Sequence, residues 1–321
     1  MSIRKVARLG LGLGLAALFA WMLVRQVQFA ELRHAFVGVD QRWIVAALIS
    51  FIAGYACRIQ RWSLMLKVAR PDLRWTDCIG PFVSSFAMNN VLPFRAGDVW
   101  RTFAYNRRLG VTSGIVVATM FVERLLDLLM VLVLFGIALA LFGLRANQLA
   151  GIGGAMLILA GAISVLVLLF PSLFSPFVNV IGRLIGRLSP SLGMKLQEEI
   201  GKSMALLAEM AQGGNMLLLL VWSMLAWLAE ACVFGFAALG IQLITVPSAS
   251  WLALPIGTLA TLIPSTPGYV GTFDYFTVQA MTILGNDHAA AIAYALLVHA
   301  LLWFPPTIFG GLYLLIRPVR S

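Results

Sequence analysis

Two stretches of this sequence carry side chains suited to binding a charged or polar molecule, and both lie between long apolar runs. They are residues 89–101, NNVLPFRAGDVWR, and residues 263–276, IPSTPGYVGTFDYF. Each combines helix-breaking Pro and Gly with amide, hydroxyl or carboxylate groups. Irregular backbone inside a bilayer is tolerated only where protein buries it or where it lines a wet cavity. We therefore expect two re-entrant hairpin tips that meet at a cavity, and a substrate in that cavity.

The composition indicates an integral membrane protein. Of the 321 residues, 61% are hydrophobic and 11% are charged, and the mean hydropathy is +0.93. Soluble proteins are about 45–50% apolar and about 25% charged. The formal net charge of +10 would suit nucleic-acid binding in a soluble protein, but here the basic residues flank apolar runs and no aromatic-basic binding module is present. We expect anionic lipid headgroups as partners, and no nucleic acid.

The apolar runs predict one all-α, polytopic membrane domain over residues 1–321, with about six transmembrane helices and two re-entrant broken hairpins. A signal peptide is the alternative for the first run, but no convincing cleavage site follows it. Two runs are too short to cross a core of about 30 Å and are therefore assigned to hairpins. In chain order, the expected elements are an N-terminal helix (6–24) and linker within 1–42, a first repeat unit (43–143) with spans at 43–66 and 111–143 around a hairpin at 78–108, a connecting span (151–171), a cytoplasmic amphipathic segment (172–214), and a second repeat unit (216–315) with spans at 216–240 and 289–315 around a hairpin at 251–284.

The first tip has the residue types that hold a phosphate. Pro93 and Gly97 permit a sharp reversal, and Asp98 is placed to cap the returning helix. A helix that begins there directs free N–H groups and its positive dipole end into the cavity. The alternative is an ordinary cytoplasmic loop with a capped helix. The expected substrate-binding residues of this tip are Asn89, Asn90, Arg95, Asp98 and Arg101.

The second tip has hydroxyl groups and one carboxylate in place of arginines. Four residues break the helix and shape this hairpin: Pro264, Pro267, Gly268 and Gly271. Thr272 or Asp274 is expected to cap the returning helix. The expected substrate-binding residues here are Ser265, Thr266 and Asp274.

Charged residues also occur inside the predicted spans. Arg58 and Arg61 are three residues apart and share one helix face; they either extend toward the headgroups or bind a carboxylate or lipid phosphate. Glu123 and Asp127 are four apart, with Arg124 beside them. Because a charge at a helix centre costs about 2.5–3.5 kcal/mol on insertion scales, we expect these acids to pair with Arg58 or Arg61. The cluster is then a structural ion-pair network or a site for coupling or for a headgroup amine.

Two further ionisable residues fall within apolar spans. Glu230 lies in LAEACVF and His299 in the last span. Intramembrane ionisable residues are functional candidates by default, so Glu230 is grouped with the coupling or headgroup-amine residues and His299 with proton relays. A packing hydrogen bond is the alternative for each.

The distribution of basic residues predicts orientation. With the N-terminus in the cytoplasm, only Arg25, Arg33, Arg42 and Arg145 fall in outside segments, so both termini are expected in the cytoplasm. The two hairpins then enter from opposite sides, as in an inverted repeat. Their tips share one spacing, Pro93 to Gly97 and Pro267 to Gly271. Transporters build midplane binding sites in this way.

Four ordered motifs between about residues 40 and 315 resemble the lysylphosphatidylglycerol synthase transmembrane, or flippase-like, family: IQRW, NNVLPFRAGDVWR, FVERLLDLL and IPSTPGYVGTFDYF. The best-known members fuse this membrane part to a cytoplasmic aminoacyl-transferring domain, and the membrane part is implicated in moving the aminoacylated lipid between leaflets. The resemblance implies a stand-alone lipid translocator without the synthase domain, and stand-alone relatives are associated with glycolipid, hopanoid or polyprenyl-phosphate pathways. It marks as signature positions Asn90, Pro93, Arg95, Gly97, Asp98, Arg101, Glu123, Arg124, Asp127, Pro264, Pro267, Gly268, Gly271 and Asp274.

These observations predict a flippase-like translocator of the inner or plasma membrane that moves a phosphate-containing lipid between leaflets. No GxxxxGK[ST] motif occurs, so neither ATP nor another cofactor is expected. No GxSxG, HExxH or DxxD pattern occurs either, so we expect no enzyme activity and no metal. The alternatives are a scaffold that recruits a separate lipid-modifying synthase through residues 172–214, and a membrane-embedded enzyme acting on a lipid phosphate.

Overall fold

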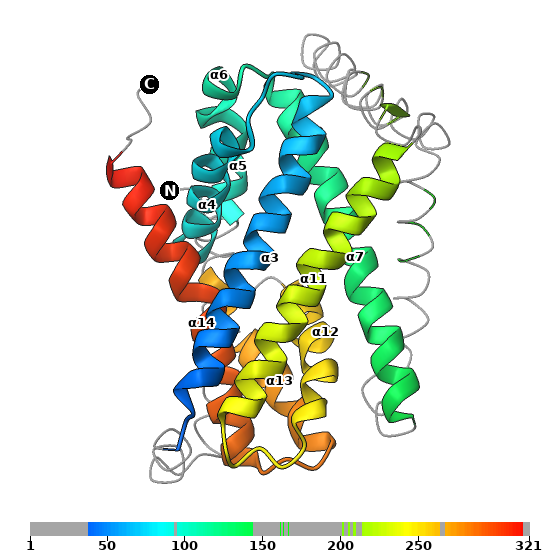
Figure 1. Ribbon diagram of the computed structural model, residues 1–321, viewed down its shortest axis with the longest axis vertical. Helices are drawn as coiled ribbons and strands as arrows, with labels where there is room; N and C mark the ends of the chain where they lie inside the picture. Colours follow the sequence, from blue (N-terminus) through cyan, green and yellow to red (C-terminus); the bar gives the residue numbers. More distant parts are fainter. Residues whose placement is uncertain are drawn as a thin grey trace, which may run out of the picture.

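A computed structural model describes residues 38–92, 95–143, 214–263 and 267–316, together with single positions between 161 and 209. Its described residues form helices joined by short loops, and no strand occurs among them beyond one isolated bridge between Val39 and Ile241. The expectation of an all-α membrane protein is confirmed. Figure 1 shows long helices running along the molecule with shorter helices between them.

Four of the described helices are long and apolar enough to cross a membrane. Their bounds differ from the expected spans by no more than two residues at either end. They are α3 (Gln41–Lys67), α7 (Ser113–Phe142), α11 (Gly214–Gly240) and α14 (His288–Ile316). The expected spans at 6–24 and 151–171 and the amphipathic segment at 172–214 lie outside the described residues, apart from single positions in the last two.

Local sequence explains where two of these helices begin and end. The Asp40 carboxylate caps α3 by accepting a hydrogen bond from the Arg42 N–H at 2.9 Å. Thr112 caps α7 by accepting from the Ile115 N–H, and α7 ends at Gly143, whose φ of 59° turns the chain away. Side-chain oxygens at these positions satisfy N–H groups that the first helical turn leaves free.

Each hairpin has two main arms, α4 and α5 in the first and α12 and α13 in the second, joined by an irregular tip. The first contains α4 (Trp75–Val91), α5 (Ala96–Ala104) and α6 (Asn106–Leu109). The second contains the short helix η3 (Pro247–Ala249), α12 (Ser250–Ala260), η4 (Pro267–Tyr269) and α13 (Thr272–Ile283). In Figure 1, α4 to α6 occupy one half of the molecule and α12 and α13 the other half. The hairpins therefore enter from opposite ends, with their tips directed toward the middle.

The helix starts at the two tips differ from the sequence prediction. The N-cap of α5 is Arg95, with φ 52°, and the N-cap of α13 is Gly271, with φ 90°. The N-cap position is therefore not held by Asp98, Thr272 or Asp274. Asp274 nevertheless caps α13 as predicted, because its carboxylate accepts the Gly271 N–H at 2.8 Å. Asp98 and Asp274 stand three residues into their helices, where the helix N-terminus still favours a carboxylate.

These helix starts also show that the Pro-to-Gly spacing shared by the two tips does not mark equivalent positions. Gly97 lies inside α5, whereas Gly271 precedes α13, so the two glycines are not structurally equivalent. The equivalent pairs are Arg95 with Gly271, and Asp98 with Asp274. A residue with positive φ reverses the chain in both tips, and the carboxylate follows three positions later.

Two apolar clusters form the core, one around each hairpin. The cluster around the first hairpin includes Trp62, Phe82 and Leu126, and the cluster around the second includes Phe234 and Tyr294. Gly97 allows α5 to lie directly on α4, because a Cβ atom there would stand 1.9 Å from the Ser85 carbonyl oxygen. Gly310 brings α14 equally close to α4, since its Cβ would stand 2.5 Å from the Val83 carbonyl oxygen.

Helix α14 continues through Pro305 and Pro306. The sequence predicts a kink there, because proline lacks the N–H that a helix needs and clashes with the preceding turn. On one side of this pair α14 carries His299 and packs against α13; on the other side it carries Gly310 and packs against α4.

Candidate functional site

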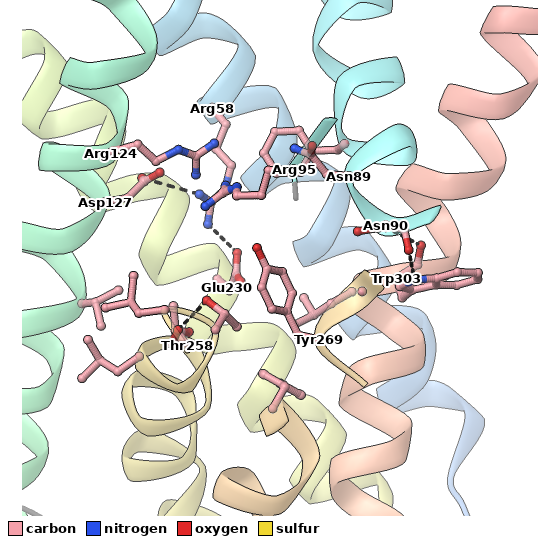
Figure 2. A pocket seen from close by; sticks show the side chains of 18 of the residues that line it. Arg58, Asn89, Asn90, Arg95, Arg124, Asp127, Glu230, Thr258, Tyr269 and Trp303 are labelled. Atoms are coloured by element: carbon pink, nitrogen blue, oxygen red, sulfur yellow. Dashed lines mark hydrogen bonds and ion pairs between the residues drawn. The ribbon is translucent and has the colours of Figure 1, made fainter. Parts of the chain in front are cut away.

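A cavity of about 380 Å³ lies between the two hairpin tips. Its size falls in the range of ligand pockets, about 300–1,000 Å³. Residues of α3, α4, α7, α11, α12 and α14 and of both tips line it. Its polar lining includes Arg58, Asn89, Asn90, Arg95, Arg124, Asp127, Glu230, Thr258, Tyr269, His299 and Trp303. Figure 2 shows the arginines on one side of the space and Tyr269 with Thr258 on the other.

A continuous row of ion pairs crosses the middle of the protein, and we call it the inner chain. Its members, in order of contact, are Glu230, Arg58, Asp127, Arg61, Glu123 and Arg101. The pairs measure 2.6 Å for Arg58 with Glu230, 3.6 Å for Arg58 with Asp127, 2.9 Å for Arg61 with Asp127, 3.9 Å for Arg61 with Glu123, and 2.9 Å for Arg101 with Glu123. Three guanidinium groups meet three carboxylates, so the inner chain is electrically balanced.

One end of the inner chain is fully enclosed. The side chains of Arg61 and Arg101 are 0% exposed and that of Glu123 is 1% exposed. The Arg101 guanidinium lies 4.8 Å from the centre of the Trp62 ring and 5.2 Å from that of Phe82. Aromatic faces stabilise a cation that has lost its water. Removing one partner of such a pair leaves an unpaired buried charge, so this end holds helices α3, α5 and α7 together.

A second group of charges, the tip cluster, consists of Arg95, Asp98 and Arg124. The Asp98 carboxylate lies 3.2 Å from Arg95 Nε and 3.6 Å from Arg124 Nη2. Asn89 fixes this carboxylate, since its amide donates to Asp98 Oδ1 at 2.8 Å and its oxygen accepts from the Asp98 N–H. Two guanidinium groups share one carboxylate, and the side chains of Arg95 and Arg124 are 42% and 35% exposed. The tip cluster therefore presents one surplus positive charge to the cavity, beside the N-terminus of α5.

The second tip is almost free of charge. Within residues 250–284 the only charged residue is Asp274. Its carboxylate accepts the Gly271 N–H at 2.8 Å and lies 2.7 Å from His299 Nδ1. Next to it, Tyr269 adopts a positive φ of 60° and lines the cavity. In Figure 2, Tyr269 directs its hydroxyl toward the arginines across the cavity.

Trp303 of α14 stands where the two tips meet. Its indole N–H donates to the Asn90 carbonyl oxygen at 3.4 Å, and the Asn90 amide donates to the Trp303 carbonyl at 3.2 Å and to Thr307 Oγ1 at 2.9 Å. From the other side, a Cβ atom on Gly268 would stand 2.6 Å from the Trp303 indole nitrogen. The two irregular segments thus close one wall of the cavity together.

The arrangement in the described residues does not include a metal site, since no group of three or more His, Cys, Asp or Glu side chains among them could hold an ion. What the cavity offers is a cationic side, a row of balanced ion pairs behind it, and a neutral side with aromatic and hydroxyl groups. This set of groups suits binding of an anion attached to a polar but uncharged group.

The profile of the family described as "Lysylphosphatidylglycerol synthase TM region" matches residues 9–310 of this sequence. The chain belongs to this family. The match includes both hairpins, the helices α3, α7 and α11, and α14 as far as residue 310. Together with those helices it identifies the chain as a membrane protein.

Two curated proteins are similar to the chain. "Glycosyltransferase AglD" of Haloferax volcanii is 25% identical over 90% of this chain and 51% of its own length. "UPF0104 membrane protein MJ1078" of Methanocaldococcus jannaschii is 23% identical over 70% of this chain and 92% of its own length. The chain therefore spans about half the length of the first of these relatives. No solved structure matches the chain.

The structure distributes the sequence-predicted residues of this family member over three locations. The cavity lining includes Arg58, Asn89, Asn90, Arg95, Arg124, Asp127, Glu230 and Gly268. Behind the lining lie Arg61, Asp98, Arg101, Glu123 and Asp274, and the tips are shaped by Gly97, Pro267 and Gly271. Outside the described residues lie Pro93, Pro264, Ser265 and Thr266. Arg101, expected to hold a phosphate, is enclosed and paired with Glu123, so the cavity does not reach it.

Among the lining residues that sequence reasoning missed are four aromatic side chains with a polar atom: Tyr55, Trp227, Tyr269 and Trp303. For each of them a signal was present. Tyr55 precedes Arg58 by three residues, and Trp227 precedes Glu230 by three, so each shares a helix face with a charge already singled out. The Trp227 indole N–H donates to Asp127 Oδ1 at 3.1 Å. Tyr269 lies within the second tip itself, and Trp303 follows His299 by four residues, so it shares a helix face with that histidine.

Proposed function

We propose that this protein is a membrane translocator that moves a phosphate-containing lipid between leaflets, with the phosphate held in the central cavity. The observation that carries the proposal is the surplus positive charge of the tip cluster, exposed where two hairpins from opposite ends meet. Arg95 and Arg124 bind the phosphate, and the N-terminus of α5 adds its free N–H groups. Membership of a lipid-synthase family and the name of the first relative support a role in lipid or glycolipid metabolism or transport.

The inverted arrangement of the hairpins supplies a route between the two sides. In transporters built from inverted repeats, one unit moves against the other around a fixed midplane site, so the site opens to each side in turn. We place the protein in the cell membrane with both termini in the cytoplasm, because the basic residues favour that side. Transport uses an ion gradient or the asymmetry of the lipids and no cofactor, and the chain itself catalyses no covalent step.

Transfer of a tail-labelled phosphatidylglycerol in proteoliposomes tests this function. The double variant Arg95→Asn and Arg124→Gln removes both phosphate donors while keeping polar side chains, and Asn tolerates the positive φ of Arg95. Loss of charged hydrogen bonds should lower the transfer rate about tenfold or more. The matched control is Arg107→Gln, since Arg107 is exposed on α6, outside the cavity lining. A wild-type rate equal to that of empty vesicles, or a double variant as fast as the control, contradicts the proposal.

A second candidate function follows from the relative that is named a glycosyltransferase and of which this chain spans 51%. The membrane part then serves as a scaffold for a separate lipid-modifying synthase, docked through residues 172–214. Deletion of that segment, followed by affinity capture from the native membrane, separates the two functions. Loss of a captured synthase with unchanged lipid transfer favours the scaffold, and loss of transfer with an unchanged partner set excludes it.

A further inference from the structure

The charges that line the cavity discriminate between headgroups, and this inference rests on the proposed function. The lining contains three guanidinium groups, from Arg58, Arg95 and Arg124, and two carboxylates, from Asp127 and Glu230. One positive charge is left over. A headgroup with an additional positive charge would meet like charge in a partly enclosed cavity, where such repulsion is stronger than in bulk water.

Both carboxylates of the lining are already engaged by arginines. Glu230 Oε2 lies 2.6 Å from Arg58 Nη2, and Asp127 Oδ1 lies 2.9 Å from Arg61 Nη1. The side chains of Asp127 and Glu230 are 14% and 19% exposed, compared with 42% for Arg95. The sequence left open a headgroup-amine role for these acids. In the structure their charges are balanced within the inner chain, so an ammonium group would have to displace an arginine.

The side opposite the arginines offers uncharged contacts. Tyr269 directs a phenol hydroxyl into the cavity (Figure 2), and Trp303 presents its ring, since its indole N–H is used by Asn90. Hydroxyl groups donate to and accept from other hydroxyls, and aromatic rings pack against apolar C–H faces. This combination matches a glycerol, an inositol or a sugar.

Backbone strain lies at the two residues that face each other across this space. Among the described residues, Arg95 and Tyr269 are the only ones other than glycine with a positive φ, 52° and 60°. Such conformations cost free energy for ordinary residues and gather at ligand-binding sites. One of these residues belongs to each tip, and each places its side chain in the cavity.

We propose that the cavity selects lipids whose phosphate carries an uncharged, hydroxyl-rich headgroup, and rejects lipids whose headgroup carries an amine. Arg95 and Arg124 hold the phosphate from the first hairpin, and Tyr269 contacts the headgroup hydroxyls from the second. The selectivity is set by the surplus positive charge of the lining and by the absence of an unengaged carboxylate among the described lining residues.

Binding in detergent tests this selectivity independently of transport. Native mass spectrometry measures occupancy for four lipids with identical acyl chains: phosphatidylinositol, phosphatidylglycerol, phosphatidylethanolamine and lysyl-phosphatidylglycerol. We expect the first two to bind about tenfold more tightly than the last two. Equal or tighter binding of the amine-bearing lipids overturns the inference, as does binding of none of the four. Preferential binding without transfer in proteoliposomes supports the selectivity and overturns the proposed translocation.

Two variants test which residues of the cavity produce the selectivity. Arg95→Asp changes the lining to two guanidinium groups and three carboxylates, and Asp, like Asn, tolerates a positive φ; it should reverse the order of the four lipids. Tyr269→Phe removes one hydroxyl and keeps the ring, so phosphatidylinositol should bind about 3- to 10-fold more weakly, with phosphatidylethanolamine unchanged. An unchanged order in Arg95→Asp, with the variant folded by its thermal transition, contradicts the charge argument. An equal loss for all lipids in Tyr269→Phe contradicts the assigned contact.

Discussion

In the first hairpin, the turn into α5 begins with the charged residue Arg95 and is followed by Asp98 and Arg101. In the second hairpin, the turn into α13 is followed by a single charged residue, Asp274. The backbone plan is similar in the two, with a residue of positive φ at the helix start and a carboxylate three positions later. The first carboxylate binds two arginines, and the second binds one histidine and a backbone N–H. Similar backbone geometry thus supports a cationic wall on one side of the cavity and a neutral wall on the other.

The comparison also separates two ways of holding a hairpin inside a membrane protein. The first hairpin is held through buried charges, because Arg101 reaches Glu123 on α7. The second is held mainly through apolar packing of α12 and α13, with residues such as Leu252, Ala253 and Val278 fully buried. We therefore expect substitutions of charged residues to affect the first hairpin more, and the following experiments test this difference.

The largest effect is expected for Arg101→Met. This variant leaves Glu123 charged, buried and without its closest partner, which should reduce the free energy of unfolding by about 3–5 kcal/mol. Thermal unfolding in detergent measures the loss. The double variant Arg101→Met and Glu123→Met removes both charges and should recover most of the stability. A single variant as stable as wild type would show that charge does not hold the first hairpin.

The second-largest difference between the two hairpins is expected in their tolerance of an added methyl group. A Cβ on Gly97 would meet the Ser85 carbonyl oxygen at 1.9 Å, whereas a Cβ on Gly257 in α12 would meet the Thr277 hydroxyl at 2.6 Å. A backbone atom cannot move aside, but a side chain can rotate. Gly97→Ala should therefore cost about 3 kcal/mol and Gly257→Ala about 1 kcal/mol, by thermal or denaturant unfolding.

Gly136 of α7 is the matched control for these two variants. No atom lies within 4 Å of the position where its Cβ would stand. Gly136→Ala should leave the protein as stable as wild type, or more stable by up to about 1 kcal/mol, because alanine favours helix. If Gly97→Ala behaved like Gly136→Ala, the close approach of α5 to α4 would be refuted.

A smaller loss is expected at the one carboxylate of the second hairpin. Asp274→Ala removes the acceptor of the Gly271 N–H and the partner of His299, which should cost about 2 kcal/mol. Asp274→Asn keeps one acceptor oxygen and should cost less than half as much. The melting temperatures of the two variants, compared with that of Arg101→Met, show which hairpin depends more on its charged residues for stability. A loss at Asp274→Ala greater than at Arg101→Met would reverse the comparison.

The smallest effect is expected where the two tips touch. Asn90→Ala removes the amide that donates to the Trp303 carbonyl and to Thr307, which should cost about 1 kcal/mol. Because this contact joins the first tip to α14, we expect it to change hydrogen exchange in α4 and in α14 alike. Exchange that rises only in α4 would mean that the Asn90 amide does not stabilise α14.

Much of the fold could be predicted from the sequence because it depends on apolar length. Runs near α4 and α12 are too short to span, and each is followed by Pro and Gly, which identifies a hairpin. The pairing of Asp127 with Arg58 and Arg61 was also predictable, since unpaired charges are costly in a span. The structure has both contacts, at 3.6 and 2.9 Å.

The remaining features depend on distances that the sequence does not contain. Arg101 and Glu123 belong to different helices, so their spacing in the sequence could not show that they form a buried ion pair. Arginine at a positive φ is uncommon, and Gly97, two residues later, was the more plausible turn residue. Tyr269 and Trp303 are uncharged, and aromatic residues in apolar segments are usually core residues. That their side chains line the cavity follows from how the hairpins meet.

Helix α14 has contacts with each hairpin on opposite sides of Pro305 and Pro306. His299, before the prolines, binds Asp274 of the second hairpin, and Gly310, after them, lies against α4 of the first. Two consecutive residues without an N–H make this the point of least resistance to bending in the helix. Asn90 of the first hairpin donates to the Trp303 carbonyl before the prolines and to Thr307 after them. A bend at the prolines therefore acts directly on the first tip, and it changes the angle between that tip and the segment of α14 that binds the second hairpin.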